Sequence, residues 1–513
     1  MAAFACSRPP NPKQTLRFHN MAEPRTLDPA GATGIPEKNL LLALAEGLTS
    51  LDPKTSAATP GVAERFVFSA DGKTLTFYLR SCVWSNGDPV TAGDFKDSWL
   101  RVLDPATASP LATLLFGIAG AREYHEGTAD AARVGIVVSD PRTLIVKFIA
   151  PQPWFLQLAA SSPFTPVHRS MTSSPRGFVH SKYFTGNGPF VLEERIPNFR
   201  IVMKKNPNYW DSANVTIETI IAYSTENKQT AVDAFRAGRT DWVDDFPGAQ
   251  AASWIGKPEL RISPYLGIYF LRFNTTKPPL HDARVRRAIH LAIDRTAICK
   301  NVTKLGQTPA AGFVPKCIET LGDYKSFRGE LYNPETARSL LAAAGYPGGK
   351  GFPRIEYQFD TSDDHKRIAE AVQAMLKENL GVDVFLVNKE KKVVIDDEEN
   401  LRYAGLSRGS WIADYTDPAT FLDIFETGAP SNRTGFTNKE YDQLLAEARA
   451  CGDAGKRMQL LSRAEQILME REFPVTPIYE YVKQTLVNPQ RVAGGFYENP
   501  MGFHPMKWIR LKE

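Results

Sequence analysis

The sequence predicts an α/β protein in which strands and helices alternate along most of the chain. Two runs rich in β-branched and aromatic residues, KTLTFYLR (73–80) and RTLIVKFIA (142–150), are typical of strands. NPETARSLLAAAGY (333–346) and DDHKRIAEAVQAMLKENLG (363–381) have the apolar spacing and the terminal signals of helices. Because such runs are interleaved rather than grouped, we expect strands and helices to share an α/β architecture.

The ends of the predicted helices carry start and stop signals. Asn333 stands where an N-cap is expected, with Pro334 at the first helical position and Gly345 after the last turn. Gly381 ends the second helix, and the strand-like run VDVFLV follows it. The pattern TNKE (437–440) is a capping box that predicts the start of a further helix.

Composition argues against a membrane-spanning or nucleic-acid-binding protein. The chain has 513 residues, of which 43% are hydrophobic and 23% charged, and its length suggests a few structural units. No run approaches the roughly 18 consecutive apolar residues of a membrane helix. The net charge of +4 is small, and no block of Lys and Arg forms a nucleic-acid patch.

The five cysteines indicate neither a zinc site nor a disulfide framework. None belongs to a C-x-x-C pair, so we expect no metal and no cofactor, and most should be buried small hydrophobic side chains. Cys6 differs, because a polar, proline-rich stretch follows it. We expect either a trimmed export signal with Cys6 as a lipid-attachment residue, or a disordered start with an incidental cysteine.

The sequence lacks the motifs of common enzyme classes. It contains no G-x-S-x-G, no P-loop, no H-E-x-x-H and no G-x-G-x-x-G after a strand. The glycine-rich stretch GYPGGKGFP (345–353) lacks Walker spacing and runs into the strand-like RIEYQF, so it is interpreted as a loop. The sequence therefore favours a protein that is not an enzyme, although catalytic triads are often scattered and their absence is weak evidence.

The stretch GSWIADYTDP (409–418) places Asp414 between the large aromatic residues Trp411 and Tyr415. Asp417 stands at a predicted N-cap, so Asp414 lies just before a helix N-terminus, whose dipole helps to keep a carboxylate ionised. Burying a carboxylate among rings is costly unless a cation meets it. The pattern predicts either a buried carboxylate that binds a cationic ligand or a structural cap for the turn.

Several stretches, in this order along the chain, resemble one protein family. They are CVWSNGDPVTAGDFKDSW (82–99), YFTGNGPFVLEE (183–194), KNPNYWD (205–211), PPLHDARVRRAIHLAIDR (278–295), NPETARSLLAAAGYPGGKGFP (333–353) and SRGSWIADYTDP (407–418). Together they resemble the family 5 extracellular solute-binding proteins of ABC importers. The resemblance extends from about residue 14 to the C-terminus.

This resemblance implies a fold and a domain organisation. The fold is two-lobed and periplasmic-binding-protein-like, of type II with an extra domain, and the ligand is enclosed between lobes joined by a hinge. Lobe I would be discontinuous and comprise residues 1–45, 162–262 and 484–513. The extra domain would cover 46–161, and lobe II would cover 263–483.

The resemblance also implies ligand-binding residues. Asp414 matches the aspartate that binds a peptide α-ammonium, and His365 matches a histidine that helps to meet the ligand carboxylate. The other matching positions offer backbone groups, rings or a basic side chain near the ligand: Ser410, Trp411, Ile412, Gly34, Ile35, Arg408, Tyr481, Phe116, Tyr265 and Phe270. Five of these residues have an alternative role. Trp411, Tyr481 and Phe116 are also candidates for the core, Arg408 for a buried ion pair, and His365 for an exposed side chain.

One departure from the family pattern bears on the ligand. The acidic run DDEEN (396–400) falls where a family member carries an arginine for the carboxylate of a short peptide. If the run lines the pocket, it predicts a different peptide length or a more basic ligand. The alternative is a solvated loop that never meets the ligand.

The resemblance implies an exported, monomeric binding protein that captures peptides outside the inner membrane and delivers them to an ABC permease. A second hypothesis keeps the fold and changes the ligand to a murein peptide, a dipeptide, a nickel complex or haem. A third is a surface adhesin or signalling lipoprotein, because fold does not determine function. A fourth, a peptidase, is disfavoured by the missing catalytic motifs.

Overall fold

The structure is a computed structural model that describes residues 12–174, 176–244, 246–320 and 322–512. Cys6 lies outside these ranges. The chain divides into two compact units: unit 1 comprises Met1–Ile262 and Gln484–Glu513, and unit 2 comprises Ser263–Lys483. Both boundaries fall inside long strands, β12 (Leu260–Phe273) and β17 (Val475–Val487).

Unit 2 is built on a mixed sheet with the strand order β15-β14-β16-β12-β17. Its remaining strands are β13 (Thr308–Pro309), β14 (Ile355–Asp360), β15 (Val384–Lys389) and β16 (Leu406–Ile412). β14 is parallel to both β15 and β16, whereas β16 is antiparallel to β12. Parallel neighbours need crossover connections, and long helices supply them here.

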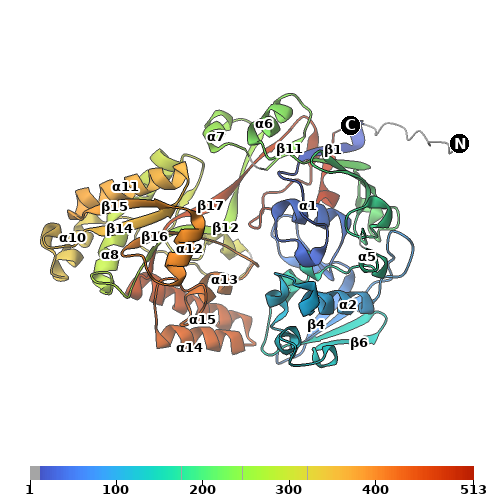
Figure 1. Cartoon of the computed structure of the whole chain (residues 1–513), viewed down its shortest axis with the longest axis horizontal. Coiled ribbons are helices and arrows are strands. Elements are labelled where there is room, and N and C mark those ends of the chain that lie inside the picture. The colour runs from blue at the N-terminus through green and yellow to red at the C-terminus, as the bar shows by residue number, and fades with distance from the viewer. Residues whose placement is uncertain (1–11, 175, 245, 321, 513) are drawn as a thin grey trace. The chain divides into compact units, whose positions relative to one another are not determined.

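Helices flank the sheet of unit 2. They are α8 (Ala283–Ala292), α9 (Arg295–Ala297), α10 (Pro334–Ala343), α11 (Asp363–Leu380), α12 (Lys391–Glu399), α13 (Ala419–Leu422), α14 (Lys439–Ala450) and α15 (Ala454–Gln466). Figure 1 shows α8, α10 and α11 gathered beside the strands, with α14 and α15 packed together away from those three helices.

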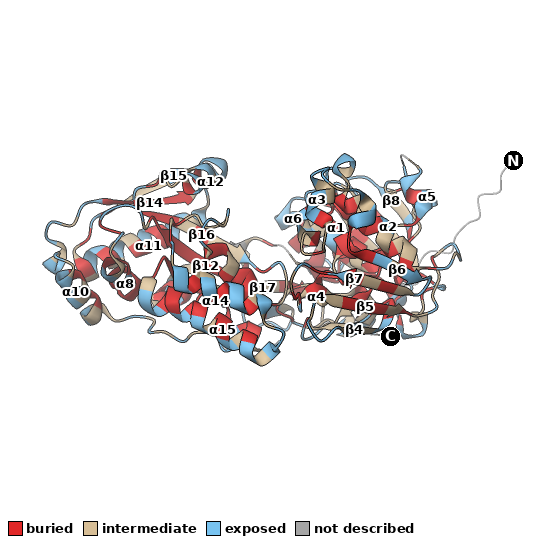
Figure 2. Ribbon diagram, turned by 90° about the horizontal axis from the view of Figure 1, so that it is seen from below, coloured by how far each residue is buried: buried red, intermediate tan, exposed pale blue. Residues whose placement is uncertain are grey.

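Each face of this sheet packs against its own set of helices. On one face, residues such as Leu271 of β12 form a core with α8, α10 and α11. On the other face, the ring of Phe270 lies 4.9 Å from that of Phe313, which contacts Phe425 at 4.8 Å. Figure 2 shows the buried strands between helices whose outer sides are exposed. β14 is likewise buried on both sides, from Ile355 to Phe359.

In unit 1 the strand order is β11-β1-β10-β9-β8, with the end of β17 beside β11. Its strands are β1 (Thr15–His19), β8 (Phe190–Ile196), β9 (Arg200–Lys205), β10 (Thr219–Tyr223) and β11 (Trp242–Val243). The core of this part includes Leu16, Phe18 and Trp242 together with Leu40 and Leu44 of the first helix.

A separate antiparallel sheet with the order β4-β5-β7-β6 lies within residues 63–147 of unit 1. Its strands are β4 (Ala63–Phe68), β5 (Thr74–Leu79), β6 (Ile136–Asp140) and β7 (Thr143–Lys147). This sheet falls inside the range 46–161, whose standing as an extra domain stays a prediction.

Within the residues that the structure describes, unit 1 also contains seven α-helices and two short strand pairs. The helices are α1 (Ile35–Leu44), α2 (Ala92–Leu103), α3 (Ala121–His125), α4 (Phe155–Leu158), α5 (Arg169–Thr172), α6 (Lys228–Arg236) and α7 (Gly248–Trp254). The strand pairs are β2 (Thr49–Leu51) with β3 (Ala58–Pro60), and β18 (Val492–Gly494) with β19 (Arg510–Leu511).

The predicted α/β architecture is confirmed, and the two strand runs are β5 and β7. Asn333 caps α10 by accepting from the amide of Thr336, and Gly381 ends α11 in the left-handed conformation. The TNKE helix, α14, begins one residue later than its capping-box pattern predicts. There Asn438 is the N-cap and accepts from the amide of Tyr441.

Candidate functional site

Strand β16 carries four of the residues predicted to bind ligand. Its register with β12 sets Arg408 opposite Leu271 and Ser410 opposite Tyr269. Successive side chains of a strand point to opposite faces. Arg408 and Ser410 therefore lie on one face of the sheet, and Trp411 lies on the other.

The two edges of β16 are paired to different extents. Pairing with β12 runs from Leu406 to Ile412, whereas pairing with β14 is confined to Leu406 and Ser407. Among the residues that the structure describes, the backbone from Arg408 to Ile412 therefore has a strand partner on one edge only. An edge of this kind can accept an extended peptide as an added strand.

A cluster of polar and aromatic side chains surrounds Arg408. Its Nη2 donates to Oη of Tyr481 at 3.2 Å, and its Nη1 lies 3.5 Å from Oδ1 of Asp360. The same oxygen of Asp360 is 3.6 Å from Nε2 of His365. The guanidinium carbon lies 4.9 Å from the ring centre of Tyr269. We call Arg408, Asp360, His365, Tyr269 and Tyr481 the arginine cluster.

Burial and charge determine the protonation of this cluster. The side chains of Arg408, Asp360 and His365 are only 14%, 16% and 16% exposed. Burial and the positive charge of Arg408 lower the pKa of His365 to about 4, against the opposing effect of Asp360. Burial works against the charge of Arg408, but the neighbouring Tyr481, Tyr269 and Asp360 raise its pKa above the ordinary value. At neutral pH the cluster thus holds a cationic arginine and a neutral histidine.

Two nitrogens of the cluster have unused hydrogen-bonding capacity. Nδ1 of His365 and Nε of Arg408 are buried, and neither has a hydrogen-bond partner among the described residues. Buried polar atoms are normally paired. The cluster is therefore suited to a polar or anionic group, which Arg408 would meet as a donor.

Asp414 is exposed rather than buried. Its backbone is held at both sides, because the amide of Ala413 donates to the carbonyl of Leu266 at 2.9 Å and its own amide donates to Oγ1 of Thr420 at 3.3 Å. The expectation of a buried carboxylate was drawn from the neighbouring rings, but Trp411 and Tyr415 are themselves only half-buried. The residue is therefore exposed on unit 2 rather than enclosed by the two rings.

The turn after Asp414 is held by a buried ion pair. The carboxylate of Asp417 accepts from Nη1 and Nη2 of Arg457 at 2.6 and 2.9 Å, and also from the amide of Ala419 at 2.9 Å. The helix that follows, α13, has only four residues and begins one residue later than expected. A helix this short contributes little dipole field at Asp414.

The remaining predicted residues of unit 2 fall into different environments. Ile412 is 39% exposed, whereas Trp411 and Tyr265 are half-buried. Phe270 is completely buried and faces Phe313, on the side of the sheet away from Arg408. Its side chain therefore belongs to the core of unit 2 rather than to a ligand surface.

Gly34, Ile35 and Phe116 belong to unit 1. Gly34 is the N-cap of α1, and Ile35, which is 44% exposed, is its first residue. Both residues therefore lie at the start of a helix. Phe116 is half-buried, with its ring centre 5.3 Å from that of His125 and 4.7 Å from the guanidinium of Arg122. The structure brings Arg408, His365 and Tyr481 together inside unit 2.

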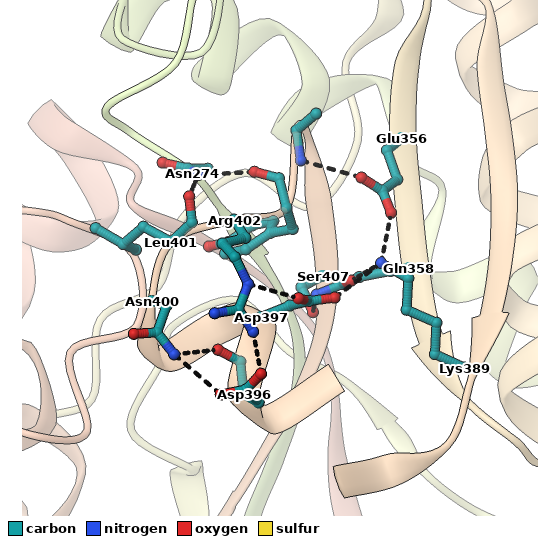
Figure 3. Close-up of polar contacts among 12 residues, drawn as sticks. Asn274, Glu356, Gln358, Lys389, Asp396, Asp397, Asn400, Leu401, Arg402 and Ser407 are labelled. Atoms are coloured by element: carbon teal, nitrogen blue, oxygen red, sulfur yellow. Dashed lines mark hydrogen bonds and ion pairs between the residues drawn. The ribbon is translucent and has the colours of Figure 1, made fainter. Parts of the chain in front are cut away.

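The acidic run 396–400 is helical rather than a loop, and Asp396, Glu399 and Asn400 within it are exposed to solvent. It forms the end of α12, and Figure 3 shows its contacts. Asp397 lies 2.9 Å from Nζ of Lys389 and 3.1 Å from Nε of Arg402, which also pairs with Asp396. Glu398 is 2% exposed and lies 3.0 Å from Nη1 of Arg272. These carboxylates are therefore matched by cations within unit 2.

Two members of the arginine cluster, Asp360 and Tyr269, are not among the residues predicted from the sequence. Asp360 ends β14 and immediately precedes TSDDHKR. A polar residue at the carboxyl end of a parallel strand is a known position for ligand contacts in α/β sheets, and this signal was available. Tyr269 sits in an apolar strand run and gave no comparable signal.

Comparison with known proteins identifies the family. The family model described as bacterial extracellular solute-binding proteins, family 5 Middle, matches residues 57–433, which is more than half of the chain. The chain belongs to family 5 of the bacterial extracellular solute-binding proteins. Like other members of family 5, it consists of mixed α/β units.

Individual relatives match over nearly their whole length. The dipeptide-binding protein DppE of Bacillus subtilis is 35% identical over 504 residues, 97% of this chain and 92% of that protein. The periplasmic oligopeptide-binding protein OppA of Escherichia coli is 34% identical over 495 residues, 94% and 90% of the two chains. The unliganded open form of the periplasmic murein tripeptide-binding protein MppA matches with a TM-score of 0.89 and 33% identity, covering 98% of both chains. This likeness confirms the two-lobed periplasmic-binding-protein fold.

Two further observations concern the described part of this family 5 protein. No helix in that part is both long and apolar enough to cross a membrane. No group of three or more His, Cys, Asp or Glu side chains is placed there to hold a metal ion.

Proposed function

We propose that this chain captures short peptides outside the inner membrane and delivers them to the permease of an ABC importer. The observation that carries the proposal is the edge of β16 between Arg408 and Ile412, which has no strand partner among the described residues. The arginine cluster lies at one end of this edge, and the exposed Asp414 follows the other end. A peptide backbone added to that edge would be held without regard to its side chains. Relatives named for dipeptides, oligopeptides and a murein tripeptide support this ligand class.

In this proposal the two charged ends of the peptide meet opposite charges. Asp414 binds the α-ammonium, and Arg408 with His365 binds the carboxylate, each through a charge-assisted hydrogen bond. Six positions separate Arg408 from Asp414, which an extended backbone spans in at most roughly 20 Å. A peptide held at both ends therefore has on the order of six residues or fewer.

We further propose that the protein acts as a monomer and without catalysis, in the periplasm or on the outer face of the membrane. In the second location Cys6 would attach it to lipid. Labelling with a radioactive fatty acid in cells, compared with Cys6→Ser, tests the attachment. Equal labelling of both proteins would rule it out.

The test of peptide binding uses native mass spectrometry with a mixed peptide pool. Wild type should bind peptides of about six residues or fewer, and Asp414→Asn should weaken binding at least about tenfold because a charge-assisted contact contributes roughly 1.5–3 kcal/mol. N-terminal acetylation of the peptides should weaken binding to wild type similarly. The matched control is Asp383→Asn, an exposed aspartate of unit 2 that pairs with Lys377.

The control variant distinguishes a general effect of removing a negative charge from the loss of the contact between Asp414 and the peptide amine. If Asp383→Asn loses as much binding as Asp414→Asn, the amine anchor is refuted. If wild type binds no peptide but co-purifies with a metal complex, haem or another small molecule, the alternative of a dedicated ligand replaces the proposal.

A further inference from the structure

Asp360 lies beside Arg408 and His365 in the arginine cluster. It ends β14, and one of its oxygens lies 3.5 Å from Nη1 of Arg408 and 3.6 Å from Nε2 of His365. These are the two side chains that the proposed function assigns to the peptide carboxylate. The ligand-free cluster therefore already contains one carboxylate beside its one arginine.

The other charged and titratable groups around His365 do not change this balance. Its own helix contributes Asp364, and α12 contributes Lys391. These two have opposite charges. From β12 the ring of Tyr269 lies 5.6 Å from the imidazole, and β17 contributes Tyr481 at the arginine. The tyrosines are neutral at neutral pH, so Arg408 and Asp360 together leave the cluster without net charge.

A peptide carboxylate entering this cluster would add an uncompensated negative charge to a mostly buried site. Burial makes such a charge costly. The cluster can restore neutrality by taking a proton onto His365, whose Nδ1 is buried and has no hydrogen-bond partner among the described residues. A terminal amide in place of the carboxylate would bring no charge and require no proton.

We propose that Asp360 is the specificity-determining residue at the carboxylate end, so that peptides with a free carboxylate bind with uptake of a proton and amide-ended peptides bind without it. This inference rests on the proposed peptide-binding function. Asp360 thereby weakens the preference for a free carboxylate at neutral pH, and the preference grows as the solution becomes more acidic.

The direction of the pH effect follows from the histidine. Burial and Arg408 hold the pKa of free His365 at about 4, and a bound carboxylate raises it. Between these two pKa values the complex holds a proton that the free protein lacks. Affinity for the free acid therefore falls as pH rises through this window, by up to about tenfold per pH unit. The peptide amine titrates equally in both peptide forms, so the comparison between forms removes its effect.

The experiment is calorimetric titration with tri-, tetra- and penta-alanine, each as the free acid and as the C-terminal amide. Titrations at several pH values between about 5 and 8, in two buffers of different ionisation enthalpy, count the protons taken up. The free acids should bind with up to about one more proton than the amides near pH 6. Asp360→Asn should raise affinity for the free acids at least about tenfold near pH 7.5, because it removes a like charge close to the ligand, and should leave the amides unchanged.

Asp364→Asn is the matched control. Asp364 also neighbours His365 but is exposed and pairs with Arg367, so its substitution should leave the ratio of acid to amide affinity unchanged. The comparison of acid and amide on wild type needs no variant, so it decides the question even if Asp360→Asn fails to fold. Equal pH dependence of the two forms would overturn the role of Asp360 while leaving peptide binding intact. If no peptide of either form binds at any pH, the proposed function itself fails.

Discussion

The buried ion pair between Asp417 and Arg457 supports the turn that presents Asp414, and its removal should be costly. The side chains of Asp417 and Arg457 are 9% and 2% exposed, and two hydrogen bonds of 2.6 and 2.9 Å join them. Removing one partner of a buried pair costs about 3–5 kcal/mol. Loss of the hydrogen bond from the amide of Ala419 adds about 1 kcal/mol. Asp417→Ala should therefore lower the free energy of unfolding by about 4–6 kcal/mol.

Urea unfolding followed by circular dichroism measures this loss. Asp417→Asn keeps an oxygen for the amide of Ala419, so it should be less damaging than Asp417→Ala by about 1 kcal/mol. Asp383→Ala breaks an ion pair whose side chains are 61% and 62% exposed, and should leave the unfolding midpoint unchanged. A loss below about 1 kcal/mol in Asp417→Ala would show that the pair does not stabilise the fold.

Two further predictions test the packing of unit 2. A Cβ at Gly409 would lie 2.6 Å from both the buried ring of Phe270 and Nη1 of Arg272, so Gly409→Ala should lower the free energy of unfolding in urea by about 1–3 kcal/mol; an unchanged midpoint would contradict the packing. Burial raises the pKa of Glu480 to about 7, against the opposing effect of Lys316. Because the folded state holds a proton that the unfolded state has lost, stability should fall as pH rises from about 4.5 to 7. Glu480→Gln should remove this fall, so its stability relative to wild type should be about 2–3 kcal/mol greater at pH 8 than at pH 5; parallel stability curves would refute it.

Local sequence signals were sufficient to predict where helices such as α10 and α11 begin and end. The amide of Thr336 bonds to its own N-cap Asn333, and Gly381 reaches the left-handed conformation that ends α11, both within a few residues of chain. The family motifs likewise predicted ligand-binding residues on β16, because each motif is a continuous stretch of sequence. Such features depend on short-range geometry, which the order of residues determines directly.

The pairing of the acidic residues 396–399 with cations could not be predicted from the sequence in the same way. DDEEN has an excess of negative charge along the sequence, yet Arg272 reaches Glu398 across 126 positions and Lys389 reaches Asp397 through the turn before α12. The burial expected for Asp414 failed for a related reason, since neighbouring rings in sequence do not enclose a side chain unless the fold turns them inward.

The sequence by itself determined the alternation of strands and helices, their main end points and the membership of family 5. Only the tertiary structure decided that β14 runs parallel to β16 and stops pairing with it at Ser407, so that beyond Ser407 this edge of β16 has no strand partner in the part of the chain that the structure describes. The same sheet order brings Asp360 to Arg408 and His365. The physical reason is that strand register and ion pairing join residues far apart in the chain, and their energies depend on burial and distance that no local pattern encodes.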